Sequence, residues 1–467
     1  MRKMKKLVAL GLSLAMAVSL VACGGSKETT EQTTTESTET TTEKTESTES
    51  TETAEAGSVY YLNFKPEVEE VWNEVAAAYT AETGVEVKVV TAASGTYEQV
   101  LKSEIAKEEA PTLFQINGPV GHANWKDYCA DLSETDFYKA LSDKTLAVTG
   151  EDDGVYGVPY TIEGYGIIYN EAILEKYFAT AGAKVASVDE INNYATLKAV
   201  VEDMTAKKAE LGIEGVFAST SLLPGEDWRW QTHTANLPIY YEYQDKGVPD
   251  LAEIEFTYSE NMKNIMDLYL NNSCVEPALT GSKTVTDSMA EFALGKVAMV
   301  QNGNWAWGQI AGVEGNTVAE EDVKFMPIYT GVAGEETQGL CIGTENFFAI
   351  NSQASEADQK ASIDFVNWLV TSETGKDAMV NKLGNTAPFT TFADDEKPTD
   401  PLAKSMLASM ESGKTAVAWA FTTFPSQTFK DNYGAALLEY ANGNMTWDDV
   451  KALVIEEWAI EKAASAE

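Results

Sequence analysis

The sequence predicts an α/β protein whose folded body, residues 58–467, has two lobes. Short β-rich runs alternate with helical patterns at the start of the body, residues 167–294 read mostly as helices, and strands return at 297–300 and 347–350. The body is long enough for more than one ordinary domain and a large core. This order of elements is expected when a chain passes between two α/β lobes more than once.

The alternation of strands and helices is clearest in the amino-terminal part of the body. One helical pattern begins at Pro66 and ends at Gly84, and another begins at Tyr97 after a loop of small residues. The β-rich runs before, between and after these helices are residues 59–64, 85–90 and 113–116. Strands joined through helices form a parallel or mixed sheet, and the loops at the strand ends open into a crevice. We therefore expect ligand-binding side chains at those strand ends.

The first residues predict export and lipid attachment. Arg2 and neighbouring lysines precede the apolar run 7–21, which is the order of a secretory signal. A membrane-spanning helix would need a longer run of about 20 apolar residues. Residues 20–24 resemble the lipobox of bacterial lipoproteins. This resemblance implies removal of the signal peptide 1–22 and attachment of acyl chains such as palmitate to Cys23. The protein would then be anchored at the extracellular face of a cell membrane of the Gram-positive type.

Residues 23–57 are predicted to be a spacer without fixed structure. After Cys23 they are almost entirely Thr, Glu and Ser, and they contain no aromatic residue. Such a segment cannot bury enough apolar surface to offset the entropy lost on ordering. We expect an extended tether that holds the folded body away from the membrane.

Composition restricts the partners and the chemistry. The formal net charge of −40 repels nucleic acid and anionic lipid, so we expect no nucleic-acid partner and membrane contact only through the lipid anchor. Only two histidines are present, and the HExxH, paired CxxC and GxSxG patterns are absent. We therefore expect no metal and no cofactor. Once Cys23 is lipidated, an odd number of cysteines remains (Cys129, Cys274 and Cys341), which fits small buried side chains better than a disulfide framework.

Two separate stretches carry a family resemblance. The first consists of Gly157-Val158-Pro159-Tyr160-Thr161 and Gly166-Ile167-Ile168-Tyr169-Asn170, with Leu174 and Lys176 following. The second is Phe292-Ala293-Leu294-Gly295-Lys296-Val297-Ala298-Met299, with Gly303 and Trp305 following. In this order and spacing they resemble the motifs of family 1 extracellular solute-binding proteins. One position departs from the motif, because Tyr160 stands where a smaller apolar residue is usual.

The resemblance implies a receptor of an ABC importer and not an enzyme. Such receptors have the type II periplasmic-binding-protein-like fold, in which two α/β lobes joined by a hinge hold a sugar in the cleft between them. The expected partners are an oligosaccharide and the permease subunits of the transporter, and the receptor is expected to be a monomer. We expect lobe 1 to comprise approximately residues 58–165 and 295–350, and lobe 2 approximately residues 166–294 and 351–467.

Candidate binding residues follow from the chemistry of a sugar. A neutral oligosaccharide offers apolar C–H faces and many hydroxyls, so its site needs flat aromatic rings and fixed hydrogen-bonding groups. Two tryptophan pairs with polar neighbours fit this need: Asp227, Trp228 and Trp230, and Asn304, Trp305 and Trp307. Polar contacts are expected from the motif where the chain crosses between lobes and from residues at or after strand ends. These residues are Glu163 and Tyr165, and Asn63, Tyr97, Asn117 and Glu345.

Other interpretations remain open. Each tryptophan also fits core packing, and asparagine at a strand end also fits turn chemistry. A surface-anchored glycoside hydrolase would need only two facing carboxylates, which so acidic a sequence can provide. Within the receptor class, a peptide, polyamine or metal ligand is an alternative, although such sites depend more on carboxylates or histidine. The abundance of aromatic residues favours a ligand with more than one ring, and an α-linked galactoside or glucoside is the narrower hypothesis.

Overall fold

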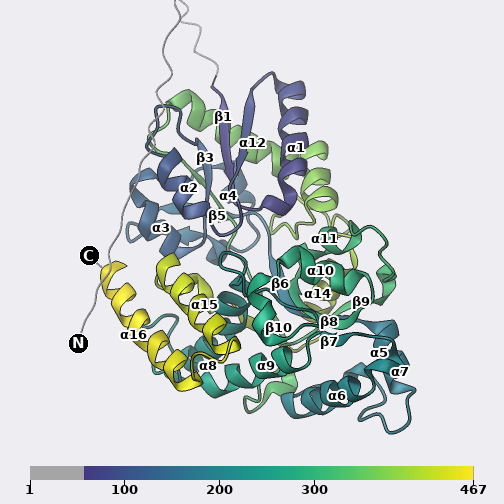
Figure 1. Ribbon diagram of the computed structural model, residues 1–467. Helices are drawn as coiled ribbons and strands as arrows, with labels where there is room; N and C mark the ends of the chain where they lie inside the picture. The colour runs from purple at the N-terminus through teal and green to yellow at the C-terminus, as the bar shows by residue number, and fades with distance from the viewer. Residues whose placement is uncertain (1–56, 466–467) are drawn as a thin grey trace, which may run out of the picture. The chain divides into compact units, whose positions relative to one another are not determined.

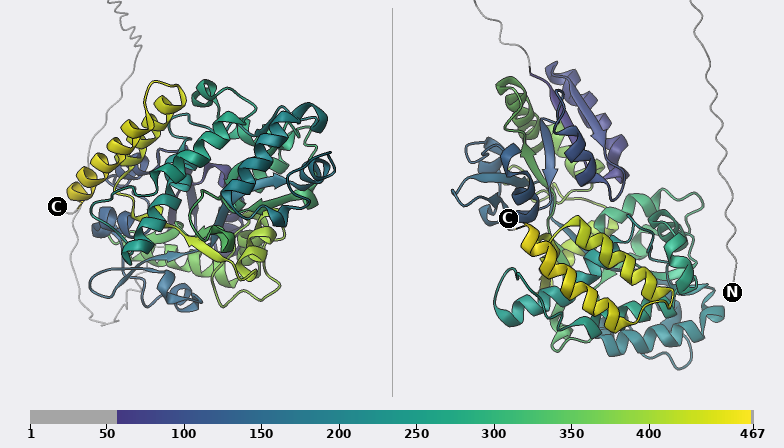
Figure 2. Two further views of the ribbon diagram at one scale, coloured as in Figure 1. Left: turned by 90° about the horizontal axis from the view of Figure 1, so that it is seen from below. Right: turned by 60° about the vertical axis from the view of Figure 1, so that its left-hand side comes forward.

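The computed structural model describes residues 57–465 (Figure 1). The predicted export signal, Cys23 and the predicted spacer up to residue 56 lie outside the described residues. Within them, every strand belongs to one of two mixed sheets. Each sheet has its own set of helices (Figure 2), so the body has the two α/β lobes that the sequence predicts. No helix in the described part of the chain combines the length and the apolar composition that a membrane span requires.

The first sheet is built mainly from the amino-terminal part of the body. In spatial order its strands are β2 (Val87–Thr91), β1 (Val59–Asn63), β3 (Leu113–Ile116), β11 (Phe347–Ile350), β5 (Val155–Pro159) and β4 (Val148–Thr149). β1 pairs in parallel with β2 and β3, whereas β11 lies antiparallel between β3 and β5. β1 is buried along its whole length, as expected for an inner strand of a sheet covered on both faces.

Helices from two distant parts of the sequence cover this sheet. They are α1 (Glu69–Thr83), α2 (Tyr97–Glu104), α3 (Pro119–Trp125), α4 (Asp136–Ala140), α12 (Glu356–Thr371) and α13 (Glu373–Asp377). Trp72 of α1 packs edge-on against Tyr61 of β1, with ring centroids 4.8 Å apart. Gly84 ends α1 with a φ of 77°, a left-handed conformation that favours glycine after a helix.

The chain enters the first lobe at Ser58. The backbone N–H of Ser58 donates to Asp358 Oδ1 at 2.8 Å, at the start of α12. Directly after it, the Val59 N–H donates to the carbonyl oxygen of Glu86 at 2.9 Å. These bonds attach the first described residues to the first lobe.

The second sheet is centred on β6. In spatial order its strands are β12 (Thr415–Ala418), β10 (Gln338–Gly343), β6 (Glu163–Asn170), β8 (Val297–Gly303) and β7 (Gly215–Phe217), and β9 (Val323–Met326) also pairs with β6. β6 is buried at every position and lies antiparallel to β8, β9 and β10. The family-like motif at residues 166–170 is therefore the inner strand of this lobe.

The second lobe contains most of the helices. They are α5 (Glu171–Phe178), α6 (Tyr194–Ala206), α7 (Lys208–Leu211), α8 (Ala235–Lys246), α9 (Ser259–Asn271), α10 (Val285–Ala293), α11 (Trp307–Ala311), α14 (Pro401–Glu411), α15 (Gln427–Ala441) and α16 (Trp447–Ser465). Their starts follow ordinary capping rules: Asn170 and Asn193 cap α5 and α6, and Thr284 and Asp287 form a capping box at α10. α15 and α16, drawn in yellow in Figure 1, pack against each other.

The two sheets divide the chain differently from the expected lobe boundaries. β8, β9 and β10 lie in the second sheet, although we expected residues 295–350 in lobe 1. α12 and the following residues up to Phe389 pack on the core of the first sheet, although we expected residues 351–467 in lobe 2. A strand-like pattern indicates that a strand exists, but it does not indicate which sheet the strand joins.

Three segments connect the two sheets. Residues 160–162 link β5 to β6, residues 344–346 link β10 back to β11, and residues 393–400 lead from the first lobe to α14. The first two run beside each other, because Gly343 pairs with Glu163 and Phe347 pairs with Pro159. The chain therefore crosses between the lobes more than once, as the order of elements predicts.

The lobes also touch away from these connections. Gly95 follows β2 in the first lobe, and Gly225 precedes the π-helix Arg229–Thr234 in the second. Ser94 Oγ donates to the carbonyl oxygen of Gly225 at 3.3 Å. A β-carbon placed on Gly95 would lie 2.8 Å from that oxygen and 2.9 Å from the α-carbon of Gly225. Only glycine at position 95 allows the two backbones to come this close.

Replacing Gly95 by alanine should push the lobes apart. The new methyl group would meet backbone atoms, which cannot move aside as a flexible side chain can. We expect a larger radius of gyration than in the wild type, measured by small-angle X-ray scattering. Gly84→Ala is the matched control, since Gly84 has a similar φ of 77° but no atom within 4 Å of its β-carbon position. Equal radii for Gly95→Ala and Gly84→Ala would contradict the expectation.

Candidate functional site

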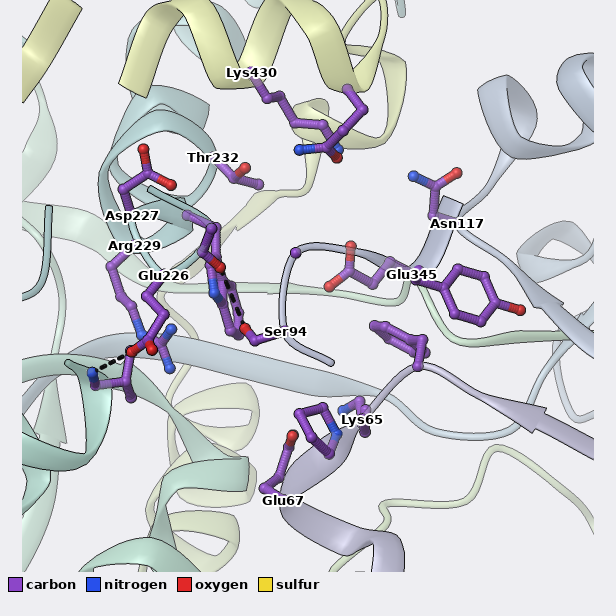
Figure 3. Close-up of a pocket in the computed structure, with 18 of the residues that line it drawn as sticks. Lys65, Glu67, Ser94, Asn117, Glu226, Asp227, Arg229, Thr232, Glu345 and Lys430 are labelled. Atoms are coloured by element: carbon purple, nitrogen blue, oxygen red, sulfur yellow. Dashed lines mark hydrogen bonds between the residues drawn. The ribbon is translucent and has the colours of Figure 1, made fainter. Parts of the chain in front are cut away.

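A cavity of about 410 Å³ lies between the two lobes. Its volume is within the range of small-molecule sites, roughly 300–1,000 Å³. Side chains from both lobes turn toward the same space (Figure 3). The first lobe contributes Phe64, Lys65, Glu67, Ser94, Tyr97, Gln115 and Asn117, the connection between the sheets contributes Glu345, and the second lobe contributes Glu163, Glu226, Asp227, Trp228, Arg229, Thr232, Trp305, Gln309, Lys430 and Asp431.

Two tryptophans form the aromatic part of the cavity. The ring centroids of Trp228 and Trp305 are 6.3 Å apart, with 20° between the ring planes. Each ring also has a cation over it: Arg229 Cζ lies 3.8 Å from the Trp228 centroid, and Lys65 Nζ lies 5.5 Å from the Trp305 centroid. Cations over indole faces restrain the rings. The pair therefore provides fixed, flat apolar surface beside charged groups.

Arg229 is the only arginine among the described residues. It is 3% exposed, it makes no ion pair within 4.0 Å, and its Nε and Nη1 have no hydrogen-bond partner. Burial lowers its pKa to about 9, which leaves the guanidinium charged at neutral pH. A buried charged donor without partners is costly unless something else satisfies it. Its place beside the cavity makes a bound ligand the natural source of acceptors.

The local fold explains how Arg229 reaches the cavity. Arg229 begins a π-helix, Arg229–Thr234, and such segments recur at functional sites. Within the same segment, the buried ring of His233 stacks on Tyr165 with centroids 4.4 Å apart. The Tyr165 hydroxyl donates to the carbonyl oxygen of His233 at 3.0 Å. Tyr165 and His233 thus hold the helix that presents Arg229.

Other cavity residues also have unused hydrogen-bonding capacity. Trp305 Nε1 is a buried donor without a partner, and Gln309 Oε1 and Asn117 Oδ1 are buried acceptors without partners. All three residues line the cavity, as Arg229 does. Buried polar groups in folded proteins almost always have partners, so unsatisfied groups that line a cavity are candidates for ligand contacts. A ligand that satisfied them would have to donate and accept hydrogen bonds, as hydroxyl groups do.

Glu163 lies at the floor of the cavity, where the chain enters β6. It is 3% exposed, forms an ion pair with Lys65, and accepts a hydrogen bond from Asn346 Nδ2. Burial lowers the pKa of Lys65, but the carboxylates of Glu163, Glu67 and Glu345 together more than offset this effect and hold that pKa above its ordinary value. Asn63 positions Lys65, because its side chain donates to the Lys65 carbonyl oxygen at 2.8 Å and accepts from the Lys65 N–H at 3.1 Å.

Two further carboxyl groups have pKa values near neutrality. Burial raises the pKa of Glu345 from 4.5 to about 7, and Lys430 opposes this rise while Glu163 adds to it. Burial likewise raises the pKa of Asp227 from 3.8 to about 6. Near neutral pH, the carboxyl of Glu345 is therefore present in both protonated and ionised forms. The protonated form can donate a hydrogen bond as well as accept one.

Seven of the expected binding residues line the cavity. They are Tyr97, Asn117, Glu163, Asp227, Trp228, Trp305 and Glu345. The Tyr97 hydroxyl already bonds to the backbone of Gln115, donating to its oxygen at 2.9 Å and accepting from its N–H at 2.7 Å. For Tyr97 the ring, rather than the hydroxyl, is therefore the group available to a ligand. That these residues bind a ligand stays a prediction.

The other five expected residues do not line this cavity. Trp230 is fully buried and donates through Nε1 to the Thr220 carbonyl oxygen at 2.9 Å, so it belongs to the core. Asn63 and Tyr165 support Lys65 and the π-helix, as described above. The last two, Asn304 and Trp307, line an adjoining cavity.

Sequence reasoning missed several cavity residues. The missed residues include Lys65, Glu67, Glu226, Arg229, Gln309, Lys430 and Asp431. Arg229 carried a signal that was available, because an arginine is rare in this chain and stands between two of the expected tryptophans. Lys430 and Asp431 carried none, since they lie on α15, far from every motif.

Among the described residues, no group of three or more His, Cys, Asp or Glu side chains could hold a metal ion.

The raised pKa of Glu345 predicts a pH-dependent cost in stability. Because its pKa is about 7 in the folded protein and near 4.5 when exposed, its contribution is most favourable below about pH 4.5 and is lost as pH rises through 7. When the pH rises from about 5 to about 8, the free energy of unfolding should therefore fall less in Glu345→Gln than in the wild type. The difference should be roughly 1–3 kcal/mol. Urea unfolding at several pH values measures this difference. Glu336→Gln, at an exposed position, is the control; equal pH profiles for wild type and Glu345→Gln would contradict the prediction.

Comparison with solved structures identifies the fold. A chitin oligosaccharide binding protein has a TM-score of 0.68 and 19% identity, covering 88% of this chain and 100% of that chain. RafE in complex with raffinose has a TM-score of 0.64 and 18% identity, covering 86% and 100%; another RafE structure is from Streptococcus pneumoniae. The GacH receptor of Streptomyces glaucescens, solved unliganded and with acarbose, has a TM-score of 0.64 and 17% identity, covering 87% and 99%. At such low identities the likeness establishes the type II binding-protein fold alone.

A comparison with curated proteins found no match. Residues 74–405, by contrast, match the family described as bacterial extracellular solute-binding protein. The match covers more than half of the chain and includes both motifs found in the sequence. The chain therefore belongs to the bacterial extracellular solute-binding proteins.

Proposed function

We propose that this protein is a receptor that captures an oligosaccharide between its lobes and delivers it to the permease of an ABC importer. One observation carries the proposal: a cavity between the lobes combines an aromatic pair with buried donors and acceptors that lack partners. A sugar ring offers a C–H face to a tryptophan and hydroxyls to polar groups on either side. No protein group among the described residues satisfies Arg229 Nε, Arg229 Nη1, Trp305 Nε1 or Gln309 Oε1.

The charges in the cavity favour a neutral sugar over an anionic one. Lys65 is already paired with Glu163. The Arg229 charge is not paired directly, but Glu67 and Glu226 lie near enough to raise the pKa of its guanidinium. An added carboxylate would meet those two glutamates, whereas a hydroxyl pair could accept from the arginine and donate to a glutamate.

The ligands of similar proteins agree with this ligand class. Those ligands are chitin oligosaccharides, raffinose, stachyose and acarbose. Raffinose and stachyose are α-galactosides, and acarbose resembles an α-glucoside. We therefore retain an α-linked galactoside or glucoside as the narrower proposal for this chain.

We propose lobe closure around the ligand as the mechanism. The cavity is lined from both lobes, so a ligand contacts its full set of partners only when the lobes are together. A ligand that binds this arrangement better shifts the population toward it. Segments 160–162 and 344–346, which run side by side between the sheets, are the proposed hinge. The closed receptor, acting as a monomer, would then dock on the permease.

The alternative of a glycoside hydrolase has no support from the comparisons. The family and the similar structures are binding proteins. The Glu163 carboxylate is engaged by Lys65 and Asn346, which suits a fixed binding group. We therefore propose a receptor without catalytic activity.

Calorimetry with raffinose, stachyose, maltotriose and chitotriose tests the proposed function. The wild type should bind at least one of them without releasing smaller sugars. Arg229→Lys should weaken that binding about tenfold or more, because lysine keeps the charge but loses the planar fork of donors. Its thermal unfolding should stay close to that of the wild type. Cleavage products would favour the hydrolase instead, and unchanged affinity in Arg229→Lys would remove Arg229 from the site.

Anchoring through Cys23 is a separate part of the proposal. Two acyl chains hold a protein at a membrane far more firmly than one. Cys23→Ala should therefore release the protein into the medium without changing its affinity for sugar, as measured by cell fractionation and calorimetry. Retention of Cys23→Ala at the membrane would contradict lipid attachment at this residue.

A further inference from the structure

A continuous series of hydrogen bonds ends at the floor of the cavity. It begins at the backbone N–H of Phe64, which donates to Gln115 Oε1 at 2.9 Å. Gln115 Nε2 donates to the hydroxyl oxygen of Tyr160, and that hydroxyl donates to Asn346 Oδ1 at 3.3 Å. Asn346 Nδ2 donates in turn to Glu163 Oε2. This series, the floor network, therefore runs from a backbone donor to a carboxylate through three side chains.

The floor network joins residues that line the cavity to residues that do not. Phe64, Gln115 and Glu163 line the cavity, whereas Tyr160 and Asn346 lie outside its lining. Tyr160 is 2% exposed, and Asn346 is fully buried. The ring of Tyr160 borders the adjoining cavity, but its hydroxyl is occupied by Gln115 and Asn346. This hydroxyl can therefore influence a sugar in the cavity through its partners and not by direct contact.

The two ends of the floor network fix the direction of every bond in it. The Phe64 N–H can only donate, so it selects the oxygen of the Gln115 amide and leaves Nε2 to face Tyr160. The Tyr160 oxygen accepts that bond, and its single proton is then available to Asn346 Oδ1. The Asn346 amide is thereby oriented with Nδ2 toward Glu163. Bonds that point in one direction in this way polarise and strengthen one another.

Without the Tyr160 hydroxyl, the Asn346 oxygen loses the donor that fixes its amide. The amide could then turn over and present Oδ1 to the Glu163 carboxylate, so that two acceptors would face each other. Glu163 also holds Lys65, whose Nζ is its ion-pair partner. A displaced carboxylate would therefore move the ammonium that lies over Trp305 as well.

Tyr160 also connects the two segments proposed as the hinge. It belongs to segment 160–162 and Asn346 belongs to segment 344–346, and the Tyr160 N–H donates to the Asn346 carbonyl oxygen at 3.1 Å. The ring of Tyr160 stacks on Phe348 of β11, with centroids 4.3 Å apart. Tyr160 is the position at which the sequence departs from the family motif. A smaller apolar side chain there could form neither hydroxyl bond, so the floor network depends on this departure.

We propose that Tyr160 is a positioning residue of the sugar site: acting through Asn346, it fixes Glu163 and Lys65 at the floor of the cavity. This inference rests on the proposed function. It adds that the affinity for sugar depends on a hydroxyl that the sugar does not touch, placed between the two hinge segments.

Tyr160→Phe tests the proposal, because it removes the hydroxyl and keeps the ring that stacks on Phe348. Calorimetry with raffinose, stachyose, maltotriose and chitotriose identifies a sugar that the wild type binds. Tyr160→Phe should bind that sugar roughly three- to tenfold more weakly, since the polar groups at the floor would no longer be held in one arrangement. Wild-type affinity in Tyr160→Phe would overturn the positioning role while leaving the receptor proposal intact.

Tyr243→Phe is the matched control. Tyr243 is 3% exposed and lies on α8, outside the lining of both cavities. Its hydroxyl also has two partners, Asp250 Oδ1 at 3.1 Å and Thr423 Oγ1 at 2.8 Å. Both phenylalanine variants should lower the melting temperature by about 1–3 °C, but Tyr243→Phe should keep the wild-type affinity. Equal weakening of sugar binding in the two variants would trace the effect to lost stability and overturn the proposal.

A double-mutant cycle tests whether Tyr160 acts through Asn346. If it does, Tyr160→Phe combined with Asn346→Ala should bind sugar no more weakly than Asn346→Ala alone. Losses that add in the double variant would contradict this route. Should Asn346→Ala fail to fold, the comparison of Tyr160→Phe with Tyr243→Phe still decides between positioning and lost stability.

Failure of the wild type to bind any of the four sugars is a different result. It would contradict the proposed function, on which the role of Tyr160 rests. A wild type that binds sugar, compared with a Tyr160→Phe variant that binds it equally well, contradicts the role of Tyr160 alone.

Discussion

Lys65 and Glu163 meet at the floor of the cleft, one from each lobe. Lys65 follows β1 of the first sheet, and Glu163 begins β6, the inner strand of the second. Asn346, on the chain segment that returns to the first lobe, donates to the same carboxylate. Removing two charges from water costs several kcal/mol per ion, which pairing must offset. The two lobes, the proposed hinge segments 160–162 and 344–346 and the cavity therefore meet at this ion pair.

The rest of the site is built around groups that this contact does not satisfy. Arg229 is buried, and burial together with Arg229 and Lys65 holds the pKa of His233 well below its ordinary value, so the imidazole stays neutral. The neutral ring can then stack on Tyr165 and support the π-helix. Unsatisfied donors and acceptors lower the stability of the unliganded protein. Folded proteins keep such groups mainly at functional sites, and here several of them line the cavity.

Much of the fold could be predicted from the sequence because it depends on local patterns. β-rich runs at 59–64, 113–116 and 347–350 became strands with nearly the same bounds, and Gly84 ends α1 as expected. Sheet membership could not be predicted, since it is decided by pairing between distant segments such as β8 and β6. The sequence pattern is the same whichever sheet a strand joins.

The site was predicted only where a motif or a strand end indicated it. Glu163 and Trp305 belong to or adjoin the family motifs, and both line the cavity. Trp228 and Trp230 looked equivalent in the sequence, but positions two apart on a helix face opposite sides, so one lines the cavity and the other is core. Lys430 reaches the site only because α15 packs beside it, and no local pattern records that packing.

The chain continues from Ser58 directly into β1, so a tether formed by the preceding residues would be joined to the first lobe. A membrane attachment through Cys23, as proposed, would therefore reach the body at β1, beside the start of α12. The second lobe, with α15 and α16, would be connected to the tether only through the first lobe. A permease that contacts both lobes could distinguish loaded from empty receptors by the position of the second lobe relative to the first.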